Sequence, residues 1–339
     1  MKLFEPFKNF QFALNECFLC GKNLDTDELK ETLSVFPNWF MEKFGLKGHP
    51  FRMLNESYKN YEELQIPCCE DCRSQRIYPL DKKVQESFIK GYSGMKELDS
   101  YSLFLWVSKI MYGIIFLEIQ LALEDHEKEN RKSRGIMGVP PEEIPLAISP
   151  SLLTKFGQVH LFLQSLRLPI VLEDFQPFSL WILPLSEGNI QGEADKNGTI
   201  PFEYRDDMST LIFSLTALDF GFIICLQDNE MNAQYWKKPM NEWGQKPMSF
   251  KQFQEFRARV FYSAFLFIPI PDYLVLPPVS SQNEFTLEAQ PLPLSGPALF
   301  KPWSNKTYAQ VLEAFWKPWN ITKNQILEDP EKPLSELRW

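Results

Sequence analysis

Two Cys-x-x-Cys pairs are the feature that most constrains how this chain can fold. The first pair is Cys17 and Cys20, followed by Gly21, and the second is Cys69 and Cys72. Two thiolates separated by two residues can bind one tetrahedral ion, and the glycine lets backbone amides turn toward the sulfurs. Two such pairs complete a closed four-thiolate site. The sequence therefore predicts one structural zinc ion (Zn2+) held by these four cysteines.

The other two cysteines bear on the choice of ligands. Cys68 could replace Cys69 only with three residues between the paired ligands, which is a less common spacing. A redox dithiol and a rubredoxin-like iron site are alternatives to zinc, but a redox pair does not need a second Cys-x-x-Cys pair. Cys225 lies in an apolar run and is expected in the core.

The composition indicates a folded protein with an acidic body. Of the 339 residues, 44% are hydrophobic and 14% aromatic, which is too apolar for a largely disordered chain. The net charge of -9 argues against a general nucleic-acid coat, since phosphate binding needs a concentrated basic surface. Basic and acidic residues nearly balance in residues 1–95, so a contact with DNA or RNA is expected there first.

Neither the N-terminal residues nor the longest apolar stretch favours export or membrane insertion. Lys2 and Glu5 lie where a signal peptide needs an uninterrupted apolar run, so we expect a cytoplasmic protein with reduced cysteines. The stretch Leu103–Leu123 is long enough to span a bilayer, but Lys109 and Glu118 interrupt it. We therefore expect a buried helix and no membrane association.

The predicted fold class is α+β, with a zinc-binding module at residues 1–95 and a larger α+β body at residues 96–339. Apolar residues at helical spacing predict helices, and β-branched and aromatic runs between turn residues predict an antiparallel sheet. Helices are expected at 81–90, 100–125, 151–166, the first half of 250–267 and 307–316, and strands at 178–183, 200–204, 210–214 and 220–226. Residues 29–37 are also compatible with a helix, and 124–134 is expected to be a solvated loop.

Three short sequence segments, two of which contain the cysteine pairs, follow one another in a recognisable order. They are Cys17-x-x-Cys20-Gly21, then Val35-Phe36-Pro37-Asn38-Trp39-Phe40, then Ile66-Pro67-x-Cys69-x-x-Cys72 leading to Leu80-Asp81. In this order, over roughly residues 14–90, the sequence resembles the zinc-containing branch of the bacterial HNH (His-Me finger) endonucleases. The resemblance implies a small ββα module stapled by the two cysteine pairs.

The resemblance also implies that the catalytic group of the family is missing. In the family, a histidine just before the Val-Phe-Pro-like segment activates the attacking water, and nearby residues hold one divalent ion. The corresponding positions here are Leu33 and Ser34, and Arg73 follows the last cysteine, where the family often has Asn. His49 is the only histidine within residues 1–95, and it is the candidate for a rearranged active site.

Basic residues follow the second cysteine pair, where the helix of the family approaches the DNA backbone. Arg73, Arg76, Lys82 and Lys83 are the candidates for phosphate contacts, and an ordinary solvated basic face is the alternative. The expected function is that of a catalytically inactive, HNH-derived zinc protein. It would bind nucleic acid or a partner protein, in a context such as bacterial antiphage defence or a mobile element. Two alternatives are open: an active metal-dependent DNA endonuclease with a rearranged site, and a protein–protein adaptor with a purely structural zinc.

Overall fold

The fold is mixed α+β with antiparallel sheets. A computed structural model describes residues 3–4, 15–24, 32–133, 150–186, 202–244, 246–278, 283–292 and 296–337. Contacts divide the chain into two units, each assembled from three segments. Unit 1 comprises Met1–Gln85, Tyr101–Val171 and Val275–Thr286, and unit 2 comprises Glu86–Ser100, Leu172–Leu274 and Leu287–Trp339. The domain boundary at residue 95 stays a prediction.

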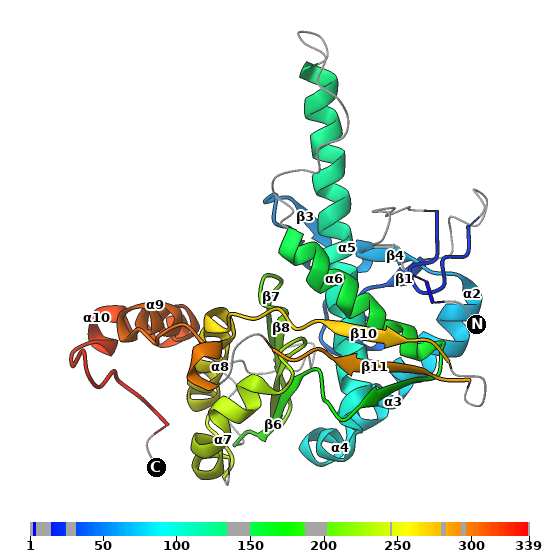
Figure 1. Cartoon of the computed structure of the whole chain (residues 1–339). Coiled ribbons are helices and arrows are strands. Elements are labelled where there is room, and N and C mark those ends of the chain that lie inside the picture. The colour runs from blue at the N-terminus through cyan, green and yellow to red at the C-terminus, as the bar shows by residue number, and fades with distance from the viewer. Residues whose placement is uncertain are drawn as a thin grey trace. The chain divides into compact units, whose positions relative to one another are not determined.

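Unit 1 contains most of a long apolar helix, α5 (Ser100–Ser133), shown in Figure 1. All residues from 102 to 119 are buried. Within the described part of the chain, α5 is the one helix with the length and hydropathy of a membrane span, and its apolar window is wholly buried, as in a core helix. Gly113 leaves room for a neighbouring segment, because a Cβ there would lie 2.6 Å from the Val35 side chain. Close packing thus fixes the chain just after β1 against α5.

Short elements of unit 1 surround the cysteine pairs. β1 pairs antiparallel with β4, with Leu33 opposite Ile66, and β2 pairs antiparallel with β3. A single π-helical turn, Arg73–Ile77, joins α2 to α3. These elements are β1 (Thr32–Ser34), α1 (Asn38–Lys43), β2 (Pro50–Arg52), β3 (Tyr58–Asn60), β4 (Gln65–Pro67), α2 (Glu70–Cys72), α6 (Pro150–Leu163) and α3 (Tyr78–Ile89), of which unit 1 contains the part up to Gln85.

Unit 2 has a four-stranded antiparallel sheet of order β6-β9-β8-β7, and α7 and α8 pack beside it (Figure 1). Gly221 in β9 permits this packing, because a Cβ there would lie 2.5 Å from the ring of Phe253 on α8. The elements are α4 (Gly91–Glu97), β6 (Ser179–Pro184), β7 (Phe202–Asp207), β8 (Ile212–Ala217), β9 (Phe220–Cys225), α7 (Met231–Trp243), α8 (Phe250–Leu266), α9 (Asn305–Phe315) and α10 (Lys323–Ile326). A three-stranded sheet has the order β10 (Tyr273–Leu276), β11 (Phe285–Ala289) and β5 (Ile170–Glu173).

Two expectations about local structure were wrong. Residues 32–34 form β1 and not a helix, because pairing with β4 satisfies their backbone groups; residues 29–31 lie outside the described residues. The stretch 124–133 continues α5 and is not a loop. It loses apolar periodicity but consists largely of Glu, Lys and Arg, which have high helix propensity and need no buried face. The helix expected only in the first half of 250–267 continues to Leu266. The other expected helices and strands occur with shifted ends, and residues 200–201 lie outside the described residues.

A buried polar network holds α7 to β6 and α8 in unit 2. Asp228 Oδ2 accepts hydrogen bonds from Ser179 Oγ at 2.6 Å and from the Asn232 backbone N–H at 3.0 Å. Ser263 Oγ donates to Asn232 Oδ1 at 2.6 Å, and Trp236 Nε1 donates to Ser263 Oγ at 2.9 Å. Burial raises the pKa of Asp228 to about 6, although these hydrogen bonds oppose the rise. The network therefore contains a carboxyl group that is easier to protonate than usual.

We expect Asp228→Asn to stabilise unit 2 at neutral pH. Between pH 3.8, the ordinary pKa of the carboxyl, and about 6, Asp228 stays protonated in the folded state but is ionised in the unfolded state. The free energy of unfolding therefore falls as the pH rises through this window. Above it, ionised Asp228 lowers the free energy of unfolding by about 3 kcal/mol. Urea unfolding of the unmodified protein and of Asp228→Asn at pH 4.5 and 7.5 measures this loss. The variant should be more stable than the unmodified protein at the higher pH. An equal difference at both pH values would contradict the assignment.

Candidate metal centre and the adjoining pocket

The first cysteine pair lies in a tight turn closed by backbone hydrogen bonds. The Gly21 N–H donates to the Cys17 carbonyl at 2.9 Å, and the Cys17 N–H donates to the Lys22 carbonyl at 2.8 Å. Gly21 has a φ of +72°, which glycine adopts without strain. The Phe18 N–H donates to the Pro67 carbonyl at 2.9 Å, so the turn is tied directly to the end of β4.

The second pair lies at the start of a helix. β4 ends at Pro67, and Cys69 then has extended backbone and caps α2, which ends at Cys72. The Arg73 N–H donates to the Cys69 carbonyl at 3.0 Å. One helical turn therefore sets the spacing of Cys69 and Cys72 and turns both sulfurs toward the first pair.

The four predicted sulfurs come together in one cluster. The Sγ atoms of Cys17, Cys20, Cys69 and Cys72 all lie within 4.8 Å of one another, and those of Cys20 and Cys69 are 3.7 Å apart. A tetrahedral zinc with sulfurs at about 2.3 Å sets neighbouring sulfurs about 3.8 Å apart. The cluster is thus positioned to hold a metal ion, and its size suits zinc. Cys68 is outside this group, with its Sγ 3.6 Å from the Cys69 carbonyl oxygen.

The electrostatics of the cluster also favour a cation. Hydrogen bonds from Cys20, Cys68 and Cys72 hold the pKa of Cys17 well below its ordinary value. The contacts with Cys17, and then burial, raise the pKa of Cys68 and Cys72, and burial raises the pKa of Cys69 to about 12. The cluster by itself therefore stabilises one thiolate. Four thiolates together need a divalent cation between them.

Two residues of α6 and its extension support the first cysteine turn. His160 Nε2 lies 2.7 Å from the Phe18 carbonyl oxygen, and Gln164 Nε2 donates to the Leu19 carbonyl at 2.9 Å. Burial lowers the pKa of His160 to about 4, so the ring is neutral near pH 7 and its Nε2–H donates to Phe18. His160 and Phe18 are 142 residues apart in sequence, so no local spacing signals this contact.

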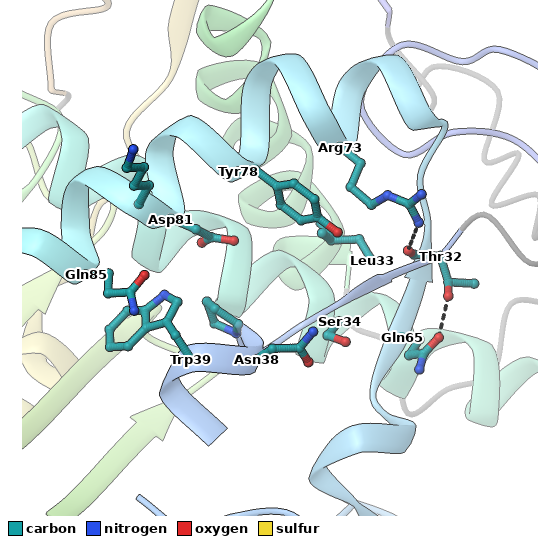
Figure 2. Close-up of a pocket in the computed structure, with 12 residues that line it drawn as sticks. Thr32, Leu33, Ser34, Asn38, Trp39, Gln65, Arg73, Tyr78, Asp81 and Gln85 are labelled. Atoms are coloured by element: carbon teal, nitrogen blue, oxygen red, sulfur yellow. Dashed lines mark hydrogen bonds between the residues drawn. The ribbon is translucent and has the colours of Figure 1, made fainter. Parts of the chain in front are cut away.

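A pocket adjoins the cysteine cluster, between β1, β4, the start of α1 and α3. It is a cavity of about 540 Å³. Figure 2 shows Arg73 and Thr32 at one end, Gln85 and Trp39 at the other, and Tyr78 and Asp81 between them. The lining residues are Thr32, Leu33, Ser34, Pro37, Asn38, Trp39, Gln65, Arg73, Tyr78, Asp81, Lys82 and Gln85. The pocket thus contains the segment where the resemblance expects a catalytic histidine.

The single carboxylate of the pocket is already paired. Lys109 Nζ on α5 lies 3.2 Å from Asp81 Oδ1, and the lysine side chain has no exposed surface. Burial raises the pKa of Asp81, and the charge of Lys109 opposes this rise. Arg73 spans the other end, where it donates to the Thr32 carbonyl at 3.1 Å and pairs with Glu70. Lys109 and Arg73 thus each have a carboxylate partner, in Asp81 and Glu70.

The predicted phosphate-binding residues fall into two groups. Arg73 and Lys82 line the pocket, and Arg76 and Lys83 do not. Arg76 is exposed, and Lys83 Nζ donates to Ser102 Oγ at 2.8 Å. His49 is also exposed and is not among the residues that line the pocket.

Comparisons of the chain with models of protein families, with curated proteins and with solved structures find no significant match. Function is therefore inferred from the chemistry of the cysteine cluster and the pocket.

Proposed function

We propose that this chain is a zinc-stapled, HNH-derived protein that binds nucleic acid in the pocket between β1, β4 and α3 without cleaving it. One observation carries the proposal. The pocket against Leu33 and Ser34 is lined by Arg73 and Lys82, but no histidine is among its described lining residues. The pairing of β1 with β4, followed by α3, with one cysteine pair before β1 and the other between β4 and α3, supports descent from the ββα module.

The lining residues lack the groups that hydrolysis needs. A nuclease of this kind requires a base for the attacking water and oxygen or nitrogen ligands for a divalent ion. Ser34 is not a base near neutral pH without a partner, and the carboxylate of Asp81 is paired with Lys109. The buried ammonium group of Lys109 takes the place that a divalent ion would need beside the Asp81 carboxylate. We therefore expect binding without turnover.

Phosphate oxygens are the ligands that suit the positive side chains of the pocket. Arginine carries five N–H donors, and Arg73 directs two of its nitrogens to Thr32 and Glu70. Lys82 is exposed at the pocket and supplies a second positive charge. Because the protein as a whole is acidic, binding depends on these local charges and weakens with added salt.

The test is a nucleic-acid binding and cleavage assay on purified protein with Mg²⁺ or Mn²⁺, run on native and denaturing gels. We expect a shifted band and intact nucleic acid. Lys82→Ala should weaken binding and reduce the slope of log affinity against log salt by about one. Lys47→Ala is the matched control, because Lys47 is exposed in the same unit, pairs with Glu42 and does not line the pocket.

The other outcomes of this assay point to the alternative functions. Cleavage that EDTA abolishes would support an active nuclease with a rearranged site and make His49 the first residue to substitute. No shift under any condition would contradict the proposal and favour a protein adaptor.

The adaptor is the second candidate, and a groove in unit 2 supports it. Met231, Gln234 and Tyr235 of α7 share one helix face and line a cavity of about 620 Å³ with residues 299–302. Tyr235 is 43% exposed, and Phe265, whose ring lies 5.6 Å from Lys301 Nζ, is 57% exposed. Exposed aromatic groups beside a lysine suit a protein segment with an apolar anchor and a carboxylate.

A further inference from the structure

One face of α3 forms a wall of the pocket. Tyr78, Asp81, Lys82 and Gln85 all line it, and they follow the spacing of neighbours on a single helix face. Trp39 and Asn38, at the start of α1, line the pocket as well. The pocket therefore brings together aromatic rings, carboxamides and positive charge.

Several of these groups are available to a ligand. Tyr78 is 50% exposed, although it is a large aromatic side chain beside a cavity. Among the described residues, no hydrogen bond involves the Tyr78 hydroxyl or the carboxamides of Asn38 and Gln85. A carboxamide offers two donors and an acceptor, and these match the edge of a planar heterocycle. The cavity has the size of sites that take small ligands.

We propose that the pocket seats an unpaired base of single-stranded nucleic acid against Tyr78, with the flanking phosphates at Arg73 and Lys82. This inference rests on the proposed function and names its substrate class. A base stacks on an exposed aromatic ring whatever its identity, and its edge meets the carboxamides. The pairing of Asp81 with Lys109 neutralises the one carboxylate among the lining residues.

Duplex nucleic acid does not fit this pocket equally well. Proteins that read a duplex insert a protruding helix or strand into a groove, whereas a base enters a concave pocket only after it leaves the stack. A single strand offers such bases without unpairing. Single strands should therefore bind at least about tenfold more tightly than a duplex of the same sequence.

The experiment is fluorescence anisotropy on the full chain with a short labelled oligo(dT), an oligo(U) of the same length and a matched duplex. The first two probes distinguish DNA from RNA, and they differ at the 2′-hydroxyl and at the C5 methyl group of thymine. Tyr78→Ala should weaken single-strand binding about tenfold, and Tyr78→Phe should retain it, because the ring and not the hydroxyl stacks. Tyr58→Ala is the matched control, since Tyr58 is 64% exposed and does not line the pocket.

The two proposals fail in different ways. Duplex binding as tight as single-strand binding, or an unchanged affinity in Tyr78→Ala, would overturn the single-strand inference and leave nucleic-acid binding intact. Binding of none of the three probes would overturn both. Circular dichroism of each variant checks that a change in affinity does not come from loss of folding. The ratio of single-strand to duplex affinity in the unmodified protein tests the inference without any substitution.

Discussion

Cys20→Ser should abolish zinc retention and strongly lower the thermal midpoint of the protein. The four sulfurs within 4.8 Å of one another join the first turn to a helix start that lies 49 residues away in sequence. Binding of structural zinc by small zinc-finger peptides is worth roughly 10–16 kcal/mol near neutral pH, and this free energy is coupled to folding. Loss of one ligand should therefore exceed the effect of an ordinary substitution, which is about 1 kcal/mol.

Cys68→Ser is the matched control for this experiment. Cys68 is buried next to Cys69 but lies outside the cluster, so its variant should keep one zinc per chain by elemental analysis. A strong chelator should lower the melting temperature of the unmodified protein and of Cys68→Ser, and should leave Cys20→Ser unchanged. Zinc loss in Cys68→Ser with retention in Cys20→Ser would overturn the ligand assignment.

Lys109→Met should destabilise the protein by about 3–5 kcal/mol, the usual range for leaving one member of a buried ion pair without its partner. Asp81 is 7% exposed, so its carboxylate would remain buried without a counter-charge. The double variant Lys109→Met, Asp81→Asn removes the unpaired charge and should recover most of the loss. Urea unfolding at neutral pH measures both free energies.

An exposed ion pair of similar length gives the comparison. Lys47 Nζ and Glu42 Oε1 are 2.8 Å apart, but both side chains are more than half exposed. Lys47→Met should therefore change the free energy of unfolding by less than about 1 kcal/mol. If Lys109→Met changes the free energy of unfolding as little as Lys47→Met does, the buried Asp81 carboxylate does not need the charge of Lys109.

The cysteine spacing predicted the main feature of the site, because its information is local. Two residues between thiols suit a tight turn or one helical turn, and both occur here. The spacing also favoured Cys69 over Cys68, and the sulfur positions agree. The strands of unit 2 were predictable for a similar reason, since β6, β8 and β9 are apolar runs between turn residues.

Contacts between distant segments were not predictable from spacing. Lys109 only interrupts an apolar run in the sequence, yet its partner Asp81 lies on another helix. The support that His160 and Gln164 give to the first cysteine turn is equally non-local. β1 was missed because its three residues form a strand only through pairing with β4. In each case the partner, and not the local sequence, determines the structure.

The π-helical turn Arg73–Ile77 separates the metal-binding turn from the face of α3 that lines the pocket. Each residue added to or removed from a helix rotates everything after it by about 100°. A deletion in this turn would therefore direct a different α3 face, without Tyr78 or Asp81, at the pocket and leave the cysteine cluster in place. In evolutionary terms, the turn is a position where one insertion or deletion changes the lining of the pocket while the fold keeps its four-cysteine cluster.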